Sequence, residues 1–159
     1  MKIQNLFFIA LFLSTSIFSA SLEFVPFSKI KPTQFVVGHL QLEIFKEKFG
    51  PIFEMEEEKQ EKKLKKEAGE AIVGPGNIYY LVDGHHHGRA FLEMKQTHFW
   101  VNVLKDWSDK TPAEFWERMK KGENGQPFVY LKDGEGKTQT IEALPANLTD
   151  LKDSPLRSV

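Results

Sequence analysis

The order of apolar and polar residues along the chain predicts several β-strands. The two kinds of residue alternate at 22–30, and at 98–107 apolar side chains occupy both faces, so we expect a strand there with both sides partly covered. A continuous apolar run at 78–82 is typical of a buried strand. The breaker-rich residues 74–77 before it predict a turn that joins it to residues 71–73 as a β-hairpin.

Two helices are predicted in the first half of the chain. In residues 34–50, Leu40, Ile44 and Phe45 recur at helical spacing and would share one apolar face, and a Gly-Pro pair ends the pattern. Residues 54–70 are dense in charge, and most of the acids precede the bases, which suits the helix macrodipole. Apolar residues are sparse there. We therefore expect a solvated helix packed loosely on the domain, with a partner-binding arm as the alternative.

Two further helices and a short strand are predicted in the second half. Residues 85–95 turn helical, with apolar side chains gathered in their second half. In residues 111–122, Thr111 followed three positions later by Glu114 is typical of the capping box at a helix start. Residues 128–131 form a short apolar run between polar, turn-rich loops, which we interpret as a strand. Together these elements predict an α+β domain with a small mixed β-sheet and flanking helices.

The first residues have the pattern of a secretory signal peptide. A single lysine precedes an apolar core at 6–13 that is too short to span a bilayer, and residues 19–21 form a small-x-small cleavage pattern. We therefore expect residues 1–21 to be a cleaved signal peptide, and the protein to be periplasmic or secreted. The mature chain, residues 22–159, would then form one domain without a membrane span.

Composition narrows the chemistry that this domain can perform. The chain contains no cysteine, which excludes disulfides and cysteine nucleophiles. The formal net charge of −1 does not favour strong non-specific binding of nucleic acid.

Three of the five histidines are consecutive and lie where a strand is predicted to meet a helix. The first N–H groups of a helix have no acceptor inside it, and the positive end of the helix dipole lies there, so such a corner favours an anion. A glycine at the corner permits close approach of a ligand to the backbone. Phosphate is the natural candidate. The residues that we expect to bind it are Gly84, His85, His86 and Arg89.

A metal site and a structural network are the competing interpretations of this corner. Successive side chains on a helix point about 100° apart, so His85, His86 and His87 do not all meet one ion without distortion. Asp83 with two of the histidines could still hold a metal ion from the turn, with Mg²⁺ or another divalent metal as the expected ion. Alternatively, the histidines are hydrogen-bonded into the fold.

The same corner resembles the ParB/sulfiredoxin superfamily, in which a strand leads through an Asp-Gly-His-His-Arg type of turn into a helix. The stretch LVDGHHHGRAFLE is similar to it, and the branch of ParB-like nucleases is more similar still. That branch has further motifs: Pro-Thr-Gln is matched here at 32–34, Val-Gly at 37–38, Gly-Pro-Gly at 74–76 and Phe-Trp-x-x-Met at 115–119. A stretch near the end of those relatives is similar to residues 151–159. The resemblance covers about residues 22–159. It implies that the chains of relatives extend beyond the position that matches residue 159, so we expect this chain to be truncated at its C-terminus.

The resemblance implies a compact α+β fold with a nucleotide-phosphate site at the histidine corner. Thr33 and Gln34 of the Pro-Thr-Gln motif, with His87, are secondary candidates for that site. His87 stands where many relatives have arginine. Gln34 stands where serine kinases of this fold have a glutamate base, and a glutamine cannot take a proton, which argues against kinase activity.

We therefore expect an exported nuclease or phosphohydrolase that acts on nucleic acid or on a phosphorylated small molecule. His85 or His86 would act as general acid or base, and Asp83 would orient a histidine or bind Mg²⁺. One alternative is a non-catalytic module that binds nucleotides or phosphate at the same corner. Another is a periplasmic interaction protein that uses the charged segment 54–70 to bind an unknown protein partner.

Overall fold

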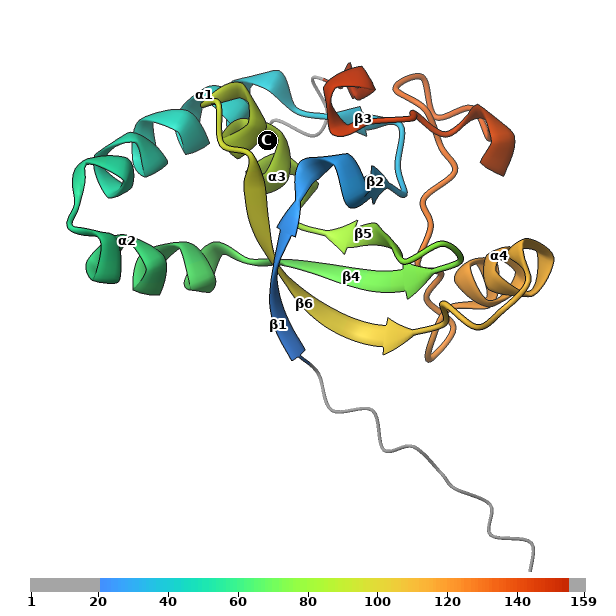
Figure 1. Ribbon diagram of the computed structural model, residues 1–159. Helices are drawn as coiled ribbons and strands as arrows, with labels where there is room; N and C mark the ends of the chain where they lie inside the picture. The colour runs from blue at the N-terminus through green and yellow to red at the C-terminus, as the bar shows by residue number, and fades with distance from the viewer. Residues whose placement is uncertain (1–20, 155–159) are drawn as a thin grey trace, which may run out of the picture.

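The computed structural model describes residues 21–154, and it confirms the predicted α+β class with a mixed sheet and flanking helices (Figure 1). Its strands are β1 (Ser21–Pro26), β2 (Ile30–Pro32), β3 (Val36–Val37), β4 (Gly69–Gly74), β5 (Ile78–Asp83), β6 (His98–Asp106) and β7 (Lys152–Asp153). Its α-helices are α1 (His39–Phe49), α2 (Glu57–Leu64), α3 (His85–Glu93) and α4 (Pro112–Lys121). Its 3₁₀ turns are η1 (Phe27–Lys29), η2 (Gly50–Glu54), η3 (Lys65–Glu67), η4 (Ile141–Ala143) and η5 (Leu148–Asp150).

The predicted signal peptide lies outside the described residues except for its last position, and so do the final residues 155–159. Within residues 21–154, no helix is long and apolar enough to cross a membrane.

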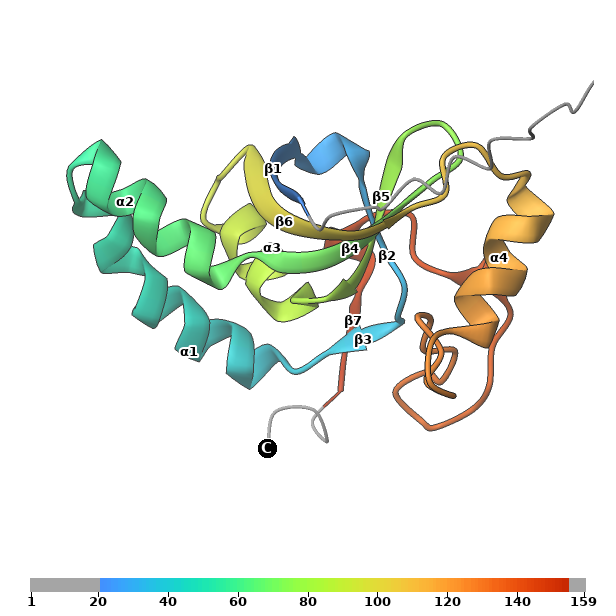
Figure 2. The same cartoon turned by 90° about the horizontal axis from the view of Figure 1, so that it is seen from below.

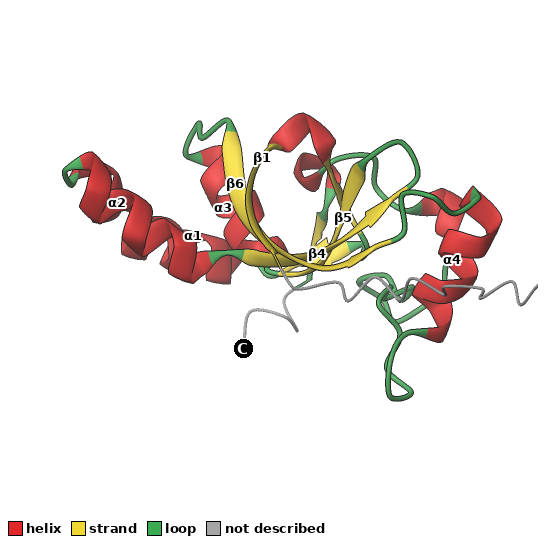
Figure 3. Ribbon diagram, turned by 60° about the horizontal axis from the view of Figure 1, so that its bottom comes forward, coloured by secondary structure: helices red, strands yellow, loops and turns green. Residues whose placement is uncertain are grey.

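The main sheet has the strand order β1-β6-β4-β5-β2 and mixes parallel with antiparallel pairs. Strands β1 and β2 follow each other in the chain, yet they form the two opposite edges of the sheet. Since only η1 joins them, the sheet must curl strongly, and Figure 3 shows this curvature. The hydroxyl of Tyr79 on β5 donates a hydrogen bond of 2.6 Å to Glu23 on β1, across the inside of the curl.

The single strand predicted at 22–30 is therefore wrong, because this stretch forms two strands. Pro26 ends β1, where it is paired with His98 at the end of the ladder. A proline has no N–H to donate to the ladder, so the chain leaves the sheet there and turns through η1. It then returns at Ile30 to pair in parallel with β5.

Two apolar clusters hold the helices on the sheet. The larger one packs α1 and α3 against the concave face through side chains that include Leu81, Phe91 and Phe99. The smaller one packs α4 through Phe115 and Met119. Burying one such large side chain stabilises the fold by about 1.5–3 kcal/mol. Figure 2 shows α1 and α2 at one end of the molecule and α4 at the other.

The predicted apolar face of the first helix is confirmed only for Phe45, which packs against the core. Leu40 and Ile44 are 62% and 53% exposed, and the buried residues of α1 are Leu42 and Phe49. Helical spacing identifies residues that share a face, but it does not decide which of two partly apolar faces meets the core. The helix also begins at His39 and not near residue 34, because the residues before it form β3.

The remaining predictions have mixed outcomes. The hairpin of β4 and β5 is confirmed, and so is α4 with its capping box between Thr111 and Glu114. The charged segment contains the shorter α2, none of whose residues is buried, as expected of a solvated helix. The strand predicted at 128–131 is wrong: no strand is formed there, although Val129 is buried against α4.

A second, two-stranded sheet was not predicted. It pairs β3 with β7 in parallel, with Val36 opposite Lys152 and Val37 opposite Asp153. Two residues of strand are too short for periodicity to reveal. This small sheet ties the segment before α1 to the end of the described chain.

Candidate functional site

Strand β5 ends at Asp83 and α3 begins at His85, so the predicted strand-to-helix corner is formed (Figure 1). Gly84 between them has a φ of 82°, which is left-handed backbone that favours glycine. A Cβ at this position would lie 2.7 Å from the Cα of Gly69, at the start of β4. The carboxylate of Asp83 accepts a hydrogen bond of 2.7 Å from the Gly84 N–H. Both the dihedral angle and the close approach therefore require glycine at the corner.

His85 connects the corner to the loop that follows β2. Its Nε2 accepts a hydrogen bond of 3.1 Å from the backbone N–H of Thr33, and its side chain is buried. The hydroxyl of Thr33 donates in turn to the carbonyl of Leu81 on β5, at 2.7 Å. Because a backbone N–H only donates, Nε2 of His85 must carry a lone pair, and the ring is neutral in this contact.

His86 makes the equivalent contact a few residues further along the same loop. Its Nε2 accepts a hydrogen bond of 3.0 Å from the backbone N–H of Gly38, so this ring is also neutral. The centroid of its ring lies 6.3 Å from the ring centroid of Phe45 on α1. His85 and His86 thus hold the two ends of residues 33–38.

His87 points to a third part of the molecule. Its Nδ1 lies 3.2 Å from the carbonyl oxygen of Glu67, and its ring packs edge-on against Phe45 and Phe49. The three imidazoles therefore do not converge on one point: His85 and His86 bind the two ends of one loop, and His87 binds Glu67. This agrees with the spacing of about 100° between successive helical residues.

Arg89 lies one turn further along α3 and is largely buried. Its Nε donates to Glu93 at 2.6 Å, and an Nη donates to the carbonyl of Leu148 at 2.8 Å. Burial opposes ionisation of Glu93, but hydrogen bonds from Arg89 and Lys46 outweigh it and hold the pKa of Glu93 below its usual value. The guanidinium consequently links α3 to η5 and, through Glu93, to α1.

The secondary candidates belong to the loop that the histidines hold. Gln34 is 8% exposed, and its amide donates to the carbonyl of Val36 at 2.8 Å. Thr33 lies beside it under His85. The structure thus brings Thr33, Gln34, His85 and His86 into one hydrogen-bonded unit. Asp83 lies at the exposed end of the corner, and Arg89 lies on the buried side of α3.

The sequence matches the protein-family model described as "Putative ParB-like nuclease" over residues 24–159. The chain belongs to this ParB-like nuclease family. The resemblance recognised in the corner motif is thereby confirmed for nearly the whole described chain.

A solved structure with a similar fold is that of protein Atu1540 from Agrobacterium tumefaciens, determined by crystallography. It is 26% identical in sequence to this ParB-like chain, with a TM-score of 0.74. The match covers 89% of this chain and 66% of that one, so this chain spans about two thirds of the length of that protein. No curated protein matches the chain.

The acid and imidazole groups of the described residues do not gather into a multidentate metal site. Within residues 21–154, no three His, Cys, Asp or Glu side chains are arranged to hold one ion. Mg²⁺, however, usually keeps several waters and binds through one or two carboxylates together with substrate phosphates. The exposed carboxylate of Asp83 suits that mode of binding, and the expected divalent metal stays a prediction.

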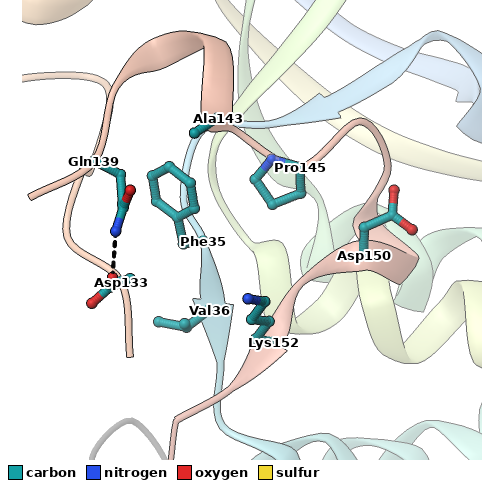
Figure 4. A pocket seen from close by; sticks show the side chains of 8 residues that line it. All are labelled: Phe35, Val36, Asp133, Gln139, Ala143, Pro145, Asp150 and Lys152. Carbon is teal, nitrogen blue, oxygen red and sulfur yellow. Dashed lines mark hydrogen bonds between the residues drawn. The ribbon is translucent and has the colours of Figure 1, made fainter. Parts of the chain in front are cut away.

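The sequence did not indicate a hollow on the far side of residues 33–38, which Figure 4 shows from close by. Its volume is about 300 Å³. Residues from the small β3–β7 sheet and from the loops before β7 line it: Phe35, Val36, Asp133, Gln139, Ala143, Pro145, Asp150 and Lys152. They come from two parts of the chain about a hundred positions apart, and no local motif marks such a site.

Proposed function

We propose that this ParB-like protein is an exported hydrolase of phosphate esters, which acts on nucleic acid or on a phosphorylated small molecule. The family match over residues 24–159 carries the proposal, because it includes the whole corner and the loop that the histidines hold. The geometry of the corner supports placing the phosphate at the start of α3. The positive end of the helix dipole lies there, and Gly84 sets no side chain over it.

The contacts of the two histidines support different roles for them. His85 is 4% exposed and holds the Thr33 N–H, so we assign it to positioning the loop. His86 is only half-buried, and its Nε2 lone pair is already directed at a proton donor, the Gly38 N–H. Exchange of that donor for a water or a substrate hydroxyl would make His86 the general base.

Asp83 and Arg89 complete the proposed site. The exposed carboxylate of Asp83 would hold a Mg²⁺ ion, which would stabilise negative charge on the phosphate and lower the pKa of a bound water. A guanidinium has five N–H donors, and the contacts of Arg89 with Glu93 and Leu148 use two of them. We assign a further donor of Arg89 to a phosphate oxygen.

The occupied lone pairs favour a second candidate function. Because Nε2 of His85 and Nε2 of His86 each accept a backbone N–H, neither ring is poised as a base in this conformation. A rigid corner of this kind would suit a non-catalytic module that binds a nucleotide or phosphate.

Hydrolysis assays with matched histidine variants separate the two functions. The purified protein would be tested on single-stranded DNA, RNA, nucleotides and a bis-aryl phosphodiester, with Mg²⁺, Mn²⁺ or EDTA. Replacing a general acid or base lowers the rate by about 10²–10⁴-fold, so His86→Ala should lose the activity. His98→Ala, on β6 away from the corner, should keep it.

Calorimetry with the same nucleotides and with phosphate completes the test. Binding that is lost in His86→Ala, without hydrolysis by the wild-type protein, would establish the binding module and overturn the hydrolase. Absence of both activities would overturn both candidate functions.

Export is tested separately through the mature N-terminus. If the signal peptide is cleaved, mass spectrometry of the protein from the periplasm or culture medium should find an N-terminus at Ser21 or Leu22. Recovery of the intact chain from the cytoplasm alone would overturn the proposed export.

A further inference from the structure

The hollow behind residues 33–38 has one apolar wall. The ring of Phe35 lies near Ala143 and Pro145, and Val36 lines the hollow on the side of Asp133, as Figure 4 shows. Phe35 and Val36 belong to the loop whose ends are held by His85 and His86. The wall is therefore positioned by hydrogen bonds before any ligand arrives.

A neutral hydrogen-bond acceptor lies beside this wall. The amide nitrogen of Gln139 donates to the carboxylate of Asp133 at 2.6 Å. A carboxylate only accepts, so this contact fixes the orientation of the amide and leaves Oε1 of Gln139 turned towards Phe35 (Figure 4). The hydrogen bond from Gln139, together with those from two backbone N–H groups, holds the pKa of Asp133 below its usual value.

A cation lies at the other end of the wall. The side chain of Lys152 extends to the hollow, and its ammonium has no hydrogen-bond or ion-pair partner within the described part of the chain. An adjoining hollow of about 380 Å³ shares Asp133, Gln139 and Lys152, so the ammonium borders both spaces.

Within the described residues, the nearby carboxylates form no ion pair with this lysine, and each accepts hydrogen bonds from other groups. Asp133 accepts from the backbone and from Gln139, as described above. Asp150 accepts from the backbone N–H and the amide of Asn147, and its carboxylate points away from the hollow in Figure 4. Asp153 accepts from the N–H of His39 at 2.9 Å. The described residues of the hollow thus present the ammonium of Lys152, the acceptor of Gln139 and an apolar wall, with the carboxylates of Asp133 and Asp150 at its border.

We propose that this hollow binds a small monocarboxylate that carries an apolar body and one N–H or O–H donor, of the N-acyl or 2-hydroxy acid class. The carboxylate pairs with Lys152, the donor meets Oε1 of Gln139, and the apolar body lies against Phe35 and Pro145. A volume of about 300 Å³ suits a ligand of this size, since it lies at the lower end of small-molecule sites. The site is independent of the proposed phosphate corner, although both share the loop at residues 33–38.

Binding is measured by NMR on the full-length protein with N-acetyl-L-leucine as the probe. We expect saturable shifts of the backbone amides of Phe35, Val36 and Lys152, with a dissociation constant on the order of 1 mM or tighter, as a small ligand allows. N-acetyl-L-leucinamide lacks the carboxylate, and 4-methylpentanoate lacks the donor. Each should bind more weakly than the probe.

Two variants and one matched control locate the site. A hydrogen bond to a charged group is worth about tenfold or more in affinity, so Lys152→Met should weaken binding of the probe by that factor. Lys132→Met, an exposed lysine that does not line the hollow, should leave it unchanged. Ala143→Phe keeps every charge but fills the space, and it should abolish binding.

Three results would overturn the proposal. The first is the absence of saturable shifts with N-acetyl-L-leucine. The second is equal affinity for its amide, and the third is unchanged affinity in both Lys152→Met and Ala143→Phe. Since none of these measurements uses a phosphate ester, failure here leaves the hydrolase proposal standing, and the converse also holds.

Discussion

Replacing His85 by phenylalanine would test the role of this imidazole as an acceptor for the loop. The change keeps an aromatic ring of similar size in a buried position but removes the Nε2 lone pair that accepts from Thr33 at 3.1 Å. The N–H of Thr33 would then be left without its acceptor, since Thr33 itself is only 2% exposed. Phenylalanine keeps the apolar contacts of the ring, so the predicted loss comes from the two imidazole nitrogens, of which Nε2 holds the loop.

The expected magnitude follows from the cost of an unsatisfied buried donor. That cost is about 1–3 kcal/mol, and no solvent can replace the lost acceptor at this depth. The free energy of unfolding falls linearly with urea concentration, and with a typical slope (the m-value) this loss should lower the urea midpoint by on the order of 1 M. The m-value itself should stay constant. His85→Gln offers an amide oxygen as acceptor and should recover part of the difference.

Urea unfolding followed by circular dichroism and by tryptophan fluorescence measures this difference, with His98→Phe as the control. His98 is a half-buried histidine on β6 whose ring stacks on Phe24, so its substitution removes no contact to the loop. If the free energies of unfolding of His85→Phe and wild type agree within about 0.5 kcal/mol, the reasoning is refuted, because changes that small are typical of surface substitutions. An equal loss in His98→Phe would refute it as well.

Three further changes have outcomes that the structure predicts. Gly84→Ala forces a Cβ into left-handed backbone and to 2.7 Å from β4, so thermal unfolding should show a loss of about 1–3 kcal/mol; an unchanged midpoint would mean that the corner can open. The hydrogen bond to Glu23 raises the pKa of Tyr79 to about 12, so its stabilisation is complete below the usual tyrosine pKa of about 10 and is lost as pH rises to 12. Tyr79→Phe should therefore be less stable than wild type at pH 8, and unfolding curves that keep this gap at pH 12 would contradict the linkage. The pKa of Glu93 is lowered, so its stabilisation is present above the usual glutamate pKa of about 4.3 and is lost as pH falls below it. Glu93→Gln should cost about 1 kcal/mol at pH 7 and approach wild type in acid, a convergence that acid titration of the two unfolding midpoints would detect.

Local chemistry made part of this fold predictable from the sequence. The capping box of α4 and the turn between β4 and β5 depend on residues within a few positions of one another. The strand-to-helix corner is equally local, since a buried strand, a glycine and a helical pattern follow each other directly. In each of these elements, the residues that determine the structure are close neighbours in the chain.

The partners of the corner residues could not be predicted in this way. His85 contacts Thr33 across 52 positions, and His86 contacts Gly38 across 48. Both contacts exist because β2 pairs with β5 from the opposite edge of a curled sheet, after the chain has left β1 at a proline. If residues 22–30 formed a single strand, residues 33–38 would lie elsewhere. Nothing in the sequence would then indicate that the imidazoles accept hydrogen bonds from this loop.

The loop at residues 33–38 is consequently the segment that His85 and His86 hold in place. One side of it is held by His85 and His86 on α3, and the other side supplies Phe35 and Val36 to the hollow. The strand β3 within this loop also pairs with β7, which carries Lys152. Any movement that frees Nε2 of His86 for chemistry must therefore release Gly38, which directly follows β3. The same hydrogen bonds that hold the imidazoles neutral thus tie the state of the corner to the shape of the hollow behind it.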